Sequence, residues 1–83
     1  MGRVSRHKPQ QLAAKLQKIR GNAGLSMSEL ITRIGSDDIP LHKGDVSKYE
    51  AGTREPPLVI LLRYAKLGKV SVETLIDDEL EII

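Results

Sequence analysis

Cysteine, tryptophan and phenylalanine are all absent from this chain of 83 residues, and tyrosine occurs only twice. Without cysteine there can be no disulfide, no thiolate metal site and no thiol nucleophile, and the composition fits a reducing compartment such as the cytoplasm. With so few aromatic rings, the core has to be built from Leu, Ile, Val and Ala side chains that interdigitate closely. We therefore expect a small aliphatic core in a cytoplasmic protein.

Groups that could carry catalysis or hold a metal ion are also scarce. His7 and His42 are the only histidines, too few to complete a zinc site without recruited carboxylates. Asp37 and Asp38 are adjacent, but the sequence offers no opposed partner or pocket of the kind a catalytic carboxylate needs, so we interpret them as turn residues. No glycine-rich phosphate loop is present. We expect neither an enzyme nor a bound metal or other cofactor.

Long apolar runs are missing, and so are acids near the N-terminus. The longest apolar run, Leu58 to Leu62, falls far short of the ~20 residues that cross a bilayer, and no signal-peptide apolar region is present, so a soluble protein is expected. The net charge is only +2, yet residues 1–20 hold six basic side chains and no acid, whereas residues 73–83 hold five acids and no base. This distribution predicts a basic pole and an acidic pole, of which the basic one would meet a polyanion first.

Glycines divide the chain into segments with helical spacing. A chain this short closes one hydrophobic core, so a single domain is expected. Gly24, Gly35, Gly52 and Gly68 each end such a segment, as expected of residues that accept the left-handed conformation after a helix. The helices are predicted at residues 9–23, 26–35, 43–51, 58–67 and 71–76.

Capping residues support these boundaries with different strength. Ser26 followed by Glu29 forms a capping box, and Ser71 can cap the last helix. Pro57 can occupy the first turn of the fourth helix. The polar turn Ser36 to Leu41 precedes the third helix, whose cap position holds His42, a poor capping residue.

The order of the helices and several side chains resemble the Xre family of helix-turn-helix repressors, which includes lambda repressor and Cro. The resemblance covers about residues 12–76. It implies a compact all-α, five-helix, lambda-repressor-like domain whose second and third helices form the helix-turn-helix. The matching residues, in nearly the family's spacing, are Leu12, Leu16, Ile19, Arg20, Gly24, Leu25, Ser26, Glu29, Leu30, Val46, Ser47, Tyr49, Glu50, Gly52, Arg54, Pro56, Leu62, Ala65, Val70 and Leu75.

The resemblance also implies which residues contact double-stranded DNA. It places the third helix in the major groove, with these residues at or beside the base-contacting positions: Lys43, Gly44, Asp45, Ser47 and Lys48. For contacts with the DNA backbone it implies Ser26, Met27, Ser28, Thr53 and Arg54. Lysine can donate to O6 and N7 of guanine, which favours a G-containing half-site, although contact of both lysines with phosphate alone is an equal alternative. The implied function is sequence-specific DNA binding by a transcriptional regulator, a repressor with no small-molecule effector.

Arg20 and Glu50 match a pair that ties the first helix to the third in the family. If partly buried, such a pair is costly to break on one side, because the surviving charge loses its partner. The alternative is two solvated charges on separate helices.

Several departures from the family pattern favour a different function. Met27 stands where the family usually has Gln, Gly44 lies inside the recognition helix, Ala51 precedes the terminal glycine, and the turn before the third helix is long. These features would suit a protein-interaction module, such as an antitoxin or adaptor, that keeps the fold.

Both ends of the chain carry predictions of their own. The sequence divides into a basic arm at residues 1–8, a helical domain at 9–78 and a short acidic and apolar tail at 79–83. The arm either reaches DNA or is a solvated terminus. Leu80, Ile82 and Ile83 suggest that the tail makes a contact, for which a homodimer seam on a palindromic operator is one candidate.

Overall fold

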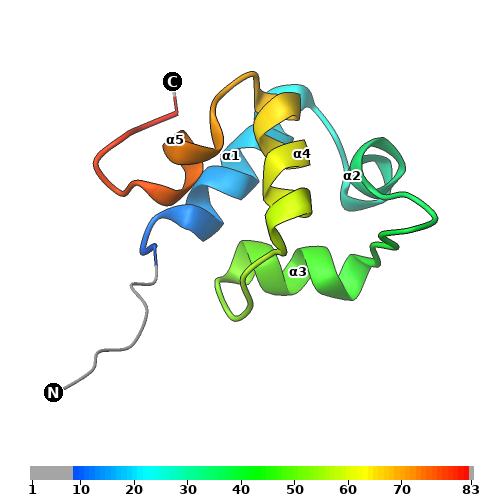
Figure 1. The fold of residues 1–83 in the computed structure, drawn as a ribbon. Coiled ribbons are helices and arrows are strands. Elements are labelled where there is room, and N and C mark those ends of the chain that lie inside the picture. The colour runs from blue at the N-terminus through cyan, green and yellow to red at the C-terminus, as the bar shows by residue number, and fades with distance from the viewer. Residues whose placement is uncertain (1–8, 83) are drawn as a thin grey trace, which may run out of the picture.

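The described part of the chain folds into five α-helices joined by turns (Figure 1). The computed structural model describes residues 9–82, and no strand occurs within that range. The all-helical class with five helices is thus confirmed. The arm predicted at residues 1–8 lies outside the described residues. The helices are α1 Leu12–Ala23, α2 Met27–Ile34, α3 Lys43–Ala51, α4 Leu58–Gly68 and α5 Val72–Ile76.

Helix α1 is the centre of the packing. It contacts α3, α4 and α5, while α2 packs on α3 and α4. Figure 1 shows α3 running along one edge of the molecule, with α2 and α5 at opposite ends. The core is aliphatic apart from two tyrosines. Its members are Leu12, Leu16, Ile19, Leu30, Ile34, Leu41, Val46, Tyr49, Ile60, Leu61, Tyr64, Ala65, Leu75 and Ile82.

The start of α1 depends on a residue from the other end of the chain. The prediction placed its start at or near Pro9, and the helix begins at Leu12. The backbone N–H groups of Gln10 and Gln11 donate to the two carboxylate oxygens of Asp78, each at 3.0 Å. The Asp78 carboxylate thus supplies acceptors to backbone N–H groups at the start of the helix, where the helix itself offers none.

The predicted serine caps are confirmed, and so is the left-handed conformation of two of the four glycines predicted to end helices. Ser26 forms a capping box with Glu29, and Ser71 accepts a hydrogen bond from the Thr74 N–H. Gly24 and Gly52 end their helices in the left-handed region, at φ 71° and 80°.

The other two glycines do not adopt the predicted conformation. Gly35 is extended, at φ −79°. Gly68 is the last residue of α4, and Lys69 takes the left-handed conformation after it, at φ 58°. Both glycines are explained by close approach instead. A Cβ on Gly35 would lie 2.8 Å from the Ile31 carbonyl oxygen, and one on Gly68 would lie 2.9 Å from Cγ1 of Ile19.

The two charged segments lie next to each other, so the prediction of opposite poles was wrong for the described residues. Helix α1 packs on α5, and the buried Lys15 donates through Nζ to the carbonyl oxygens of Thr74 and Asp77 at 2.8 and 2.7 Å. The Nζ of Lys18 donates to the Ile82 carbonyl oxygen at 2.6 Å. These lysines act as caps for the C-terminal segment, a contact that the charge pattern along the sequence cannot reveal.

Candidate functional site

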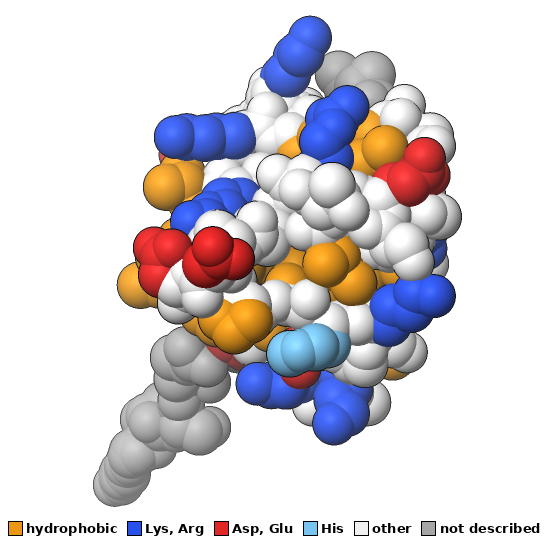
Figure 2. All heavy atoms as spheres, turned by 90° about the vertical axis from the view of Figure 1, so that its right-hand side faces the viewer, with side chains coloured by type: hydrophobic (Ala, Val, Ile, Leu, Met, Phe, Trp, Pro, Cys, Tyr) orange, Lys and Arg blue, Asp and Glu red, His pale blue; other side chains and the backbone are white. Residues whose placement is uncertain are grey.

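One face of α3 is exposed and carries the predicted base-contacting residues. Lys43, Gly44, Ser47 and Lys48 are all exposed, whereas Val46, Tyr49 and Glu50 are buried on the opposite face. Figure 2 views the end of the molecule that holds α2 and the turn after it; basic side chains lie at the lower edge, where α3 runs, and also across the upper part of this face, with an acidic group on the left. The structure therefore brings these predicted residues together on one surface.

The lysines of this face have no partner in the part of the chain that the structure describes. Neither ammonium group, of Lys43 or of Lys48, makes a hydrogen bond or ion pair within residues 9–82. The lysines of α1 differ, because the ammonium groups of Lys15 and Lys18 bind backbone carbonyl oxygens. The α3 lysines are free to bind an anion outside the chain.

Asp45 lies on the flank of this face and caps α3. Its carboxylate accepts the backbone N–H of His42 at 3.0 Å, and the His42 ring nitrogen Nδ1 lies 3.4 Å from the same oxygen. The hydrogen bond from the His42 N–H is the main cause of a lowered pKa for the Asp45 carboxyl. The carboxylate at the third helical position thus supplies the cap for which His42 alone is poorly suited.

Thr53 and Arg54, predicted to contact the DNA backbone, are fastened to α3. The Thr53 backbone N–H and hydroxyl donate to the Lys48 carbonyl oxygen at 3.0 and 3.3 Å. The Arg54 guanidinium donates to the other Asp45 oxygen at 3.0 Å and lies over the Tyr49 ring, 5.7 Å from its centroid. Both side chains remain exposed.

The N-terminal turn of α2 holds the other predicted backbone contacts. Ser26 accepts the Glu29 N–H at 3.1 Å, and its own N–H donates to the Glu29 carboxylate at 2.8 Å, which lowers the pKa of Glu29. Ser28 is exposed, whereas Met27 is half-buried and packs against the core. Methionine at this position is therefore explained by packing.

An ion pair between α1 and α3 holds α3 in place. The Arg20 Nε and Nη2 groups each donate to the Glu50 carboxylate, with a shortest distance of 2.9 Å. Glu50 is 4% exposed and Arg20 25%, and the hydrogen bonds to Glu50 raise the pKa of Arg20. Gln17 donates to the Glu50 carbonyl oxygen at 2.6 Å, and the buried Tyr64 hydroxyl lies 3.5 Å from the carboxylate. The ion pair and the hydrogen bond from Gln17 thus hold α3 against α1 on the side opposite its exposed face.

The long turn between α2 and α3 is anchored by a residue that the sequence did not single out. Arg63 of α4 donates to the Ile34 carbonyl oxygen at 2.8 Å and to the Ser36 hydroxyl at 3.0 Å. Leu41 is buried, and Asp37 and Asp38 are exposed. No local signal predicts that Arg63 anchors this turn, because in the sequence it is only a polar residue on an amphipathic helix.

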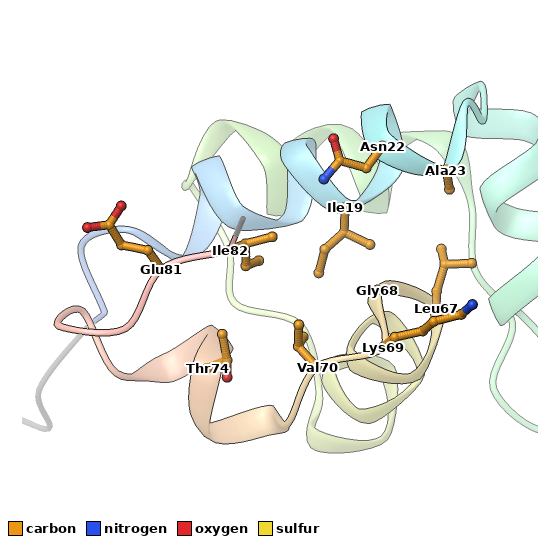
Figure 3. A pocket seen from close by; sticks show the side chains of 10 residues that line it. All are labelled: Ile19, Asn22, Ala23, Leu67, Gly68, Lys69, Val70, Thr74, Glu81 and Ile82. Carbon is orange, nitrogen blue, oxygen red and sulfur yellow. The ribbon is translucent and has the colours of Figure 1, made fainter.

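A hollow lies on a different part of the molecule, between α1, the α4–α5 turn and the C-terminal segment (Figure 3). Its volume is about 510 Å³, and its lining includes Ile19, Leu67, Val70 and Ile82. No group of three or more potential metal ligands occurs in the described part of the chain.

Comparisons with protein-family models, with curated proteins and with solved structures found no match. Among the described helices, none has the length and apolar content that crossing a membrane requires.

Proposed function

We propose that this protein binds double-stranded DNA sequence-specifically through the exposed face of α3, as a transcriptional repressor of the Xre type. In this proposal α2 and α3 are the helix-turn-helix, and the N-terminal half of α3 enters the major groove. The observation that carries it is the pair of lysines, Lys43 and Lys48, that have no partner within residues 9–82 and lie on a face otherwise made of small residues. Such a face can approach base edges closely while its cations reach guanine or phosphate.

Gly44 supports close approach to a ligand. A glycine inside a helix costs up to about 1 kcal/mol relative to alanine. Its φ is not positive, and a Cβ built on it meets nothing within 4 Å, so neither backbone conformation nor packing requires glycine here. A helix that lies deep in a groove gives a reason for the missing side chain.

The proposal is tested by fluorescence anisotropy with the duplex upstream of the protein's own gene and a scrambled duplex, at low and near-physiological salt. We expect a preference of at least ~10³ for the upstream duplex and a steep salt dependence. Lys43→Gln and Lys48→Gln should each weaken binding about tenfold or more. Lys66→Gln, which removes the same charge from the exposed side of α4, is the matched control.

An apolar surface on α4 favours a second candidate, a protein-interaction module such as an antitoxin or adaptor. Leu58 is 79% exposed, and Val59 and Leu62 are 42% exposed on the same side of α4. Exposed aliphatic clusters of this kind mark partner surfaces. This function would be favoured over DNA binding by equal, weak binding to both duplexes that vanishes with salt. In that case Lys43→Gln and Lys48→Gln should not change the affinity. If the protein binds DNA as a homodimer on a palindromic operator, the apolar surface of α4 could also serve as the contact between the two copies.

A further inference from the structure

Arg54 folds back along α3 toward the start of the helix. It follows the turn at Gly52, yet its guanidinium reaches Asp45 in the first turn, at 3.0 Å, and passes over the ring of Tyr49. Asp45 and Tyr49 are one turn apart on the same side of the helix, so the Arg54 side chain covers that flank.

Asp45 keeps its position independently of Arg54. One oxygen of its carboxylate accepts the His42 N–H, and the other faces Arg54. If Arg54 left, the first hydrogen bond would still hold the negative charge at the flank of α3. The cap therefore fixes an anion beside the proposed DNA-binding face.

The pair is within reach of a phosphate. The Arg54 side chain is 51% exposed and that of Asp45 is 26% exposed. Asp45 precedes Lys48 by three residues, so their side chains are neighbours on the helix surface. A phosphate that approaches Lys48 therefore comes close to the Asp45 carboxylate. The phosphate and the carboxylate then compete for the Arg54 guanidinium.

We propose that Asp45 is a specificity-determining residue. By binding the Arg54 guanidinium, it keeps Arg54 from binding the phosphates of non-specific DNA. The inference rests on the proposed DNA-binding function. Transfer of Arg54 to a phosphate leaves the Asp45 charge unpaired beside the polyanion, which opposes binding. A base-pair register that offers Asp45 a donor, such as the N4 amino group of cytosine, removes this penalty and releases Arg54. Asp45 thus favours one register over all others.

The first test is Asp45→Asn with the scrambled duplex over a range of salt concentrations. Asparagine can still accept the His42 N–H, so the cap is kept, and circular dichroism checks the helix content. We expect non-specific affinity to rise about tenfold at 0.1 M salt and the slope of log K against log salt to steepen by about 0.9, the value for one added phosphate contact. Glu73→Gln, which removes one charge from the exposed surface of α5, should change neither. The same increase in both variants would overturn the proposal in favour of net charge.

The second test asks whether Asp45 acts through Arg54. In an Arg54→Gln background, Asp45→Asn should increase non-specific affinity at least threefold less than it does in the wild type. In the wild-type background, Arg54→Gln should cost less non-specific affinity than Lys48→Gln, since Arg54 is already occupied. Equal gains in both backgrounds, or equal costs of the two single variants, would contradict restraint of Arg54.

The outcomes separate this inference from the function on which it depends. If the wild type prefers its upstream duplex but Asp45→Asn changes neither affinity nor preference, only the role of Asp45 is rejected. If the wild type binds no duplex even at low salt, both are rejected.

Discussion

Single side chains decide how closely the helices of this protein approach each other. Gly68, at the end of α4, lies against Ile19 of α1, and a Cβ there would meet its Cγ1 and Cδ1 atoms at 2.9 and 3.0 Å. Cγ2 of Ile19 would also lie within 3.3 Å, so the buried side chain would have to shift as a whole and not at its tip alone. Gly68 is therefore required by packing between helices, although in sequence it looks like a helix stop.

Replacing Gly68 by alanine should destabilise the fold, while the same change at Gly21 should not. Gly68→Ala forces Ile19 to shift, at an expected cost of about 1–3 kcal/mol in the free energy of unfolding. Gly21 lies inside α1, is exposed and has nothing within 4 Å of a built Cβ, so Gly21→Ala should gain up to about 1 kcal/mol from helix propensity. Urea unfolding of both variants measures the difference. A stabilising Gly68→Ala would show that α1 and α4 are less closely packed than the structure describes.

Helix α3 depends on its neighbours more than on its own sequence. It has nine residues, includes a glycine, and buries only Val46, Tyr49 and Glu50. A helix this short is marginal in isolation, so its position has to come from tertiary contacts. Arg20 and Gln17 of α1 supply such contacts through the Glu50 carboxylate and carbonyl.

Loss of the Glu50 carboxylate should loosen α3 from α1. Glu50→Ala leaves the Tyr64 hydroxyl without a partner among the described residues and the Arg20 guanidinium with the Leu25 carbonyl oxygen alone. Alanine itself costs nothing in helix propensity. Breaking one side of a buried pair costs about 3–5 kcal/mol, and we expect the lower end because Arg20 is 25% exposed. Glu79→Ala, at an exposed position, is the control and should change stability by less than about 0.5 kcal/mol. Similar losses in thermal or urea unfolding for the two variants would contradict a stabilising pair.

The sequence was most informative where the signal is local. Hydrophobic spacing and the serine caps predicted the helices, because Ser26 and Ser71 bind amides three residues away. The failures involve residues far apart in the chain. The start of α1 depends on Asp78, the turn after α2 depends on Arg63, and Arg54 binds back to Asp45. Local patterns do not encode such pairings. The resemblance predicted which residues of α3 form its outer face, whereas the hydrogen bonds of Asp45 and Arg54 beside that face follow no pattern in the sequence.

The two ends of the described chain meet beside α1. Figure 1 shows the segment after α5 returning toward the helix near the start of the described residues. Asp78 binds the amides that precede α1, Lys15 and Lys18 bind carbonyls of the C-terminal segment, and Ile82 belongs to the core. Residues that the charge pattern assigned to an acidic tail thus complete the fold.

Shortening the side chain of Ile82 should therefore destabilise the whole domain. Ile82 is 7% exposed and packs in the core near Ile19, whereas Leu80, two residues earlier, is 37% exposed. Ile82→Ala should lower the free energy of unfolding by about 2 kcal/mol, at the low end for a buried isoleucine because Ile82 borders the hollow beside α1 and its surroundings can relax into the space left behind. Leu80→Ala removes similar side-chain volume from a more exposed site and should cost less than about 1 kcal/mol. Urea unfolding of the two variants provides the comparison. Equally small losses would mean that the C-terminal segment is not part of the core in solution, and the lysines of α1 would then be available to bind an external anion.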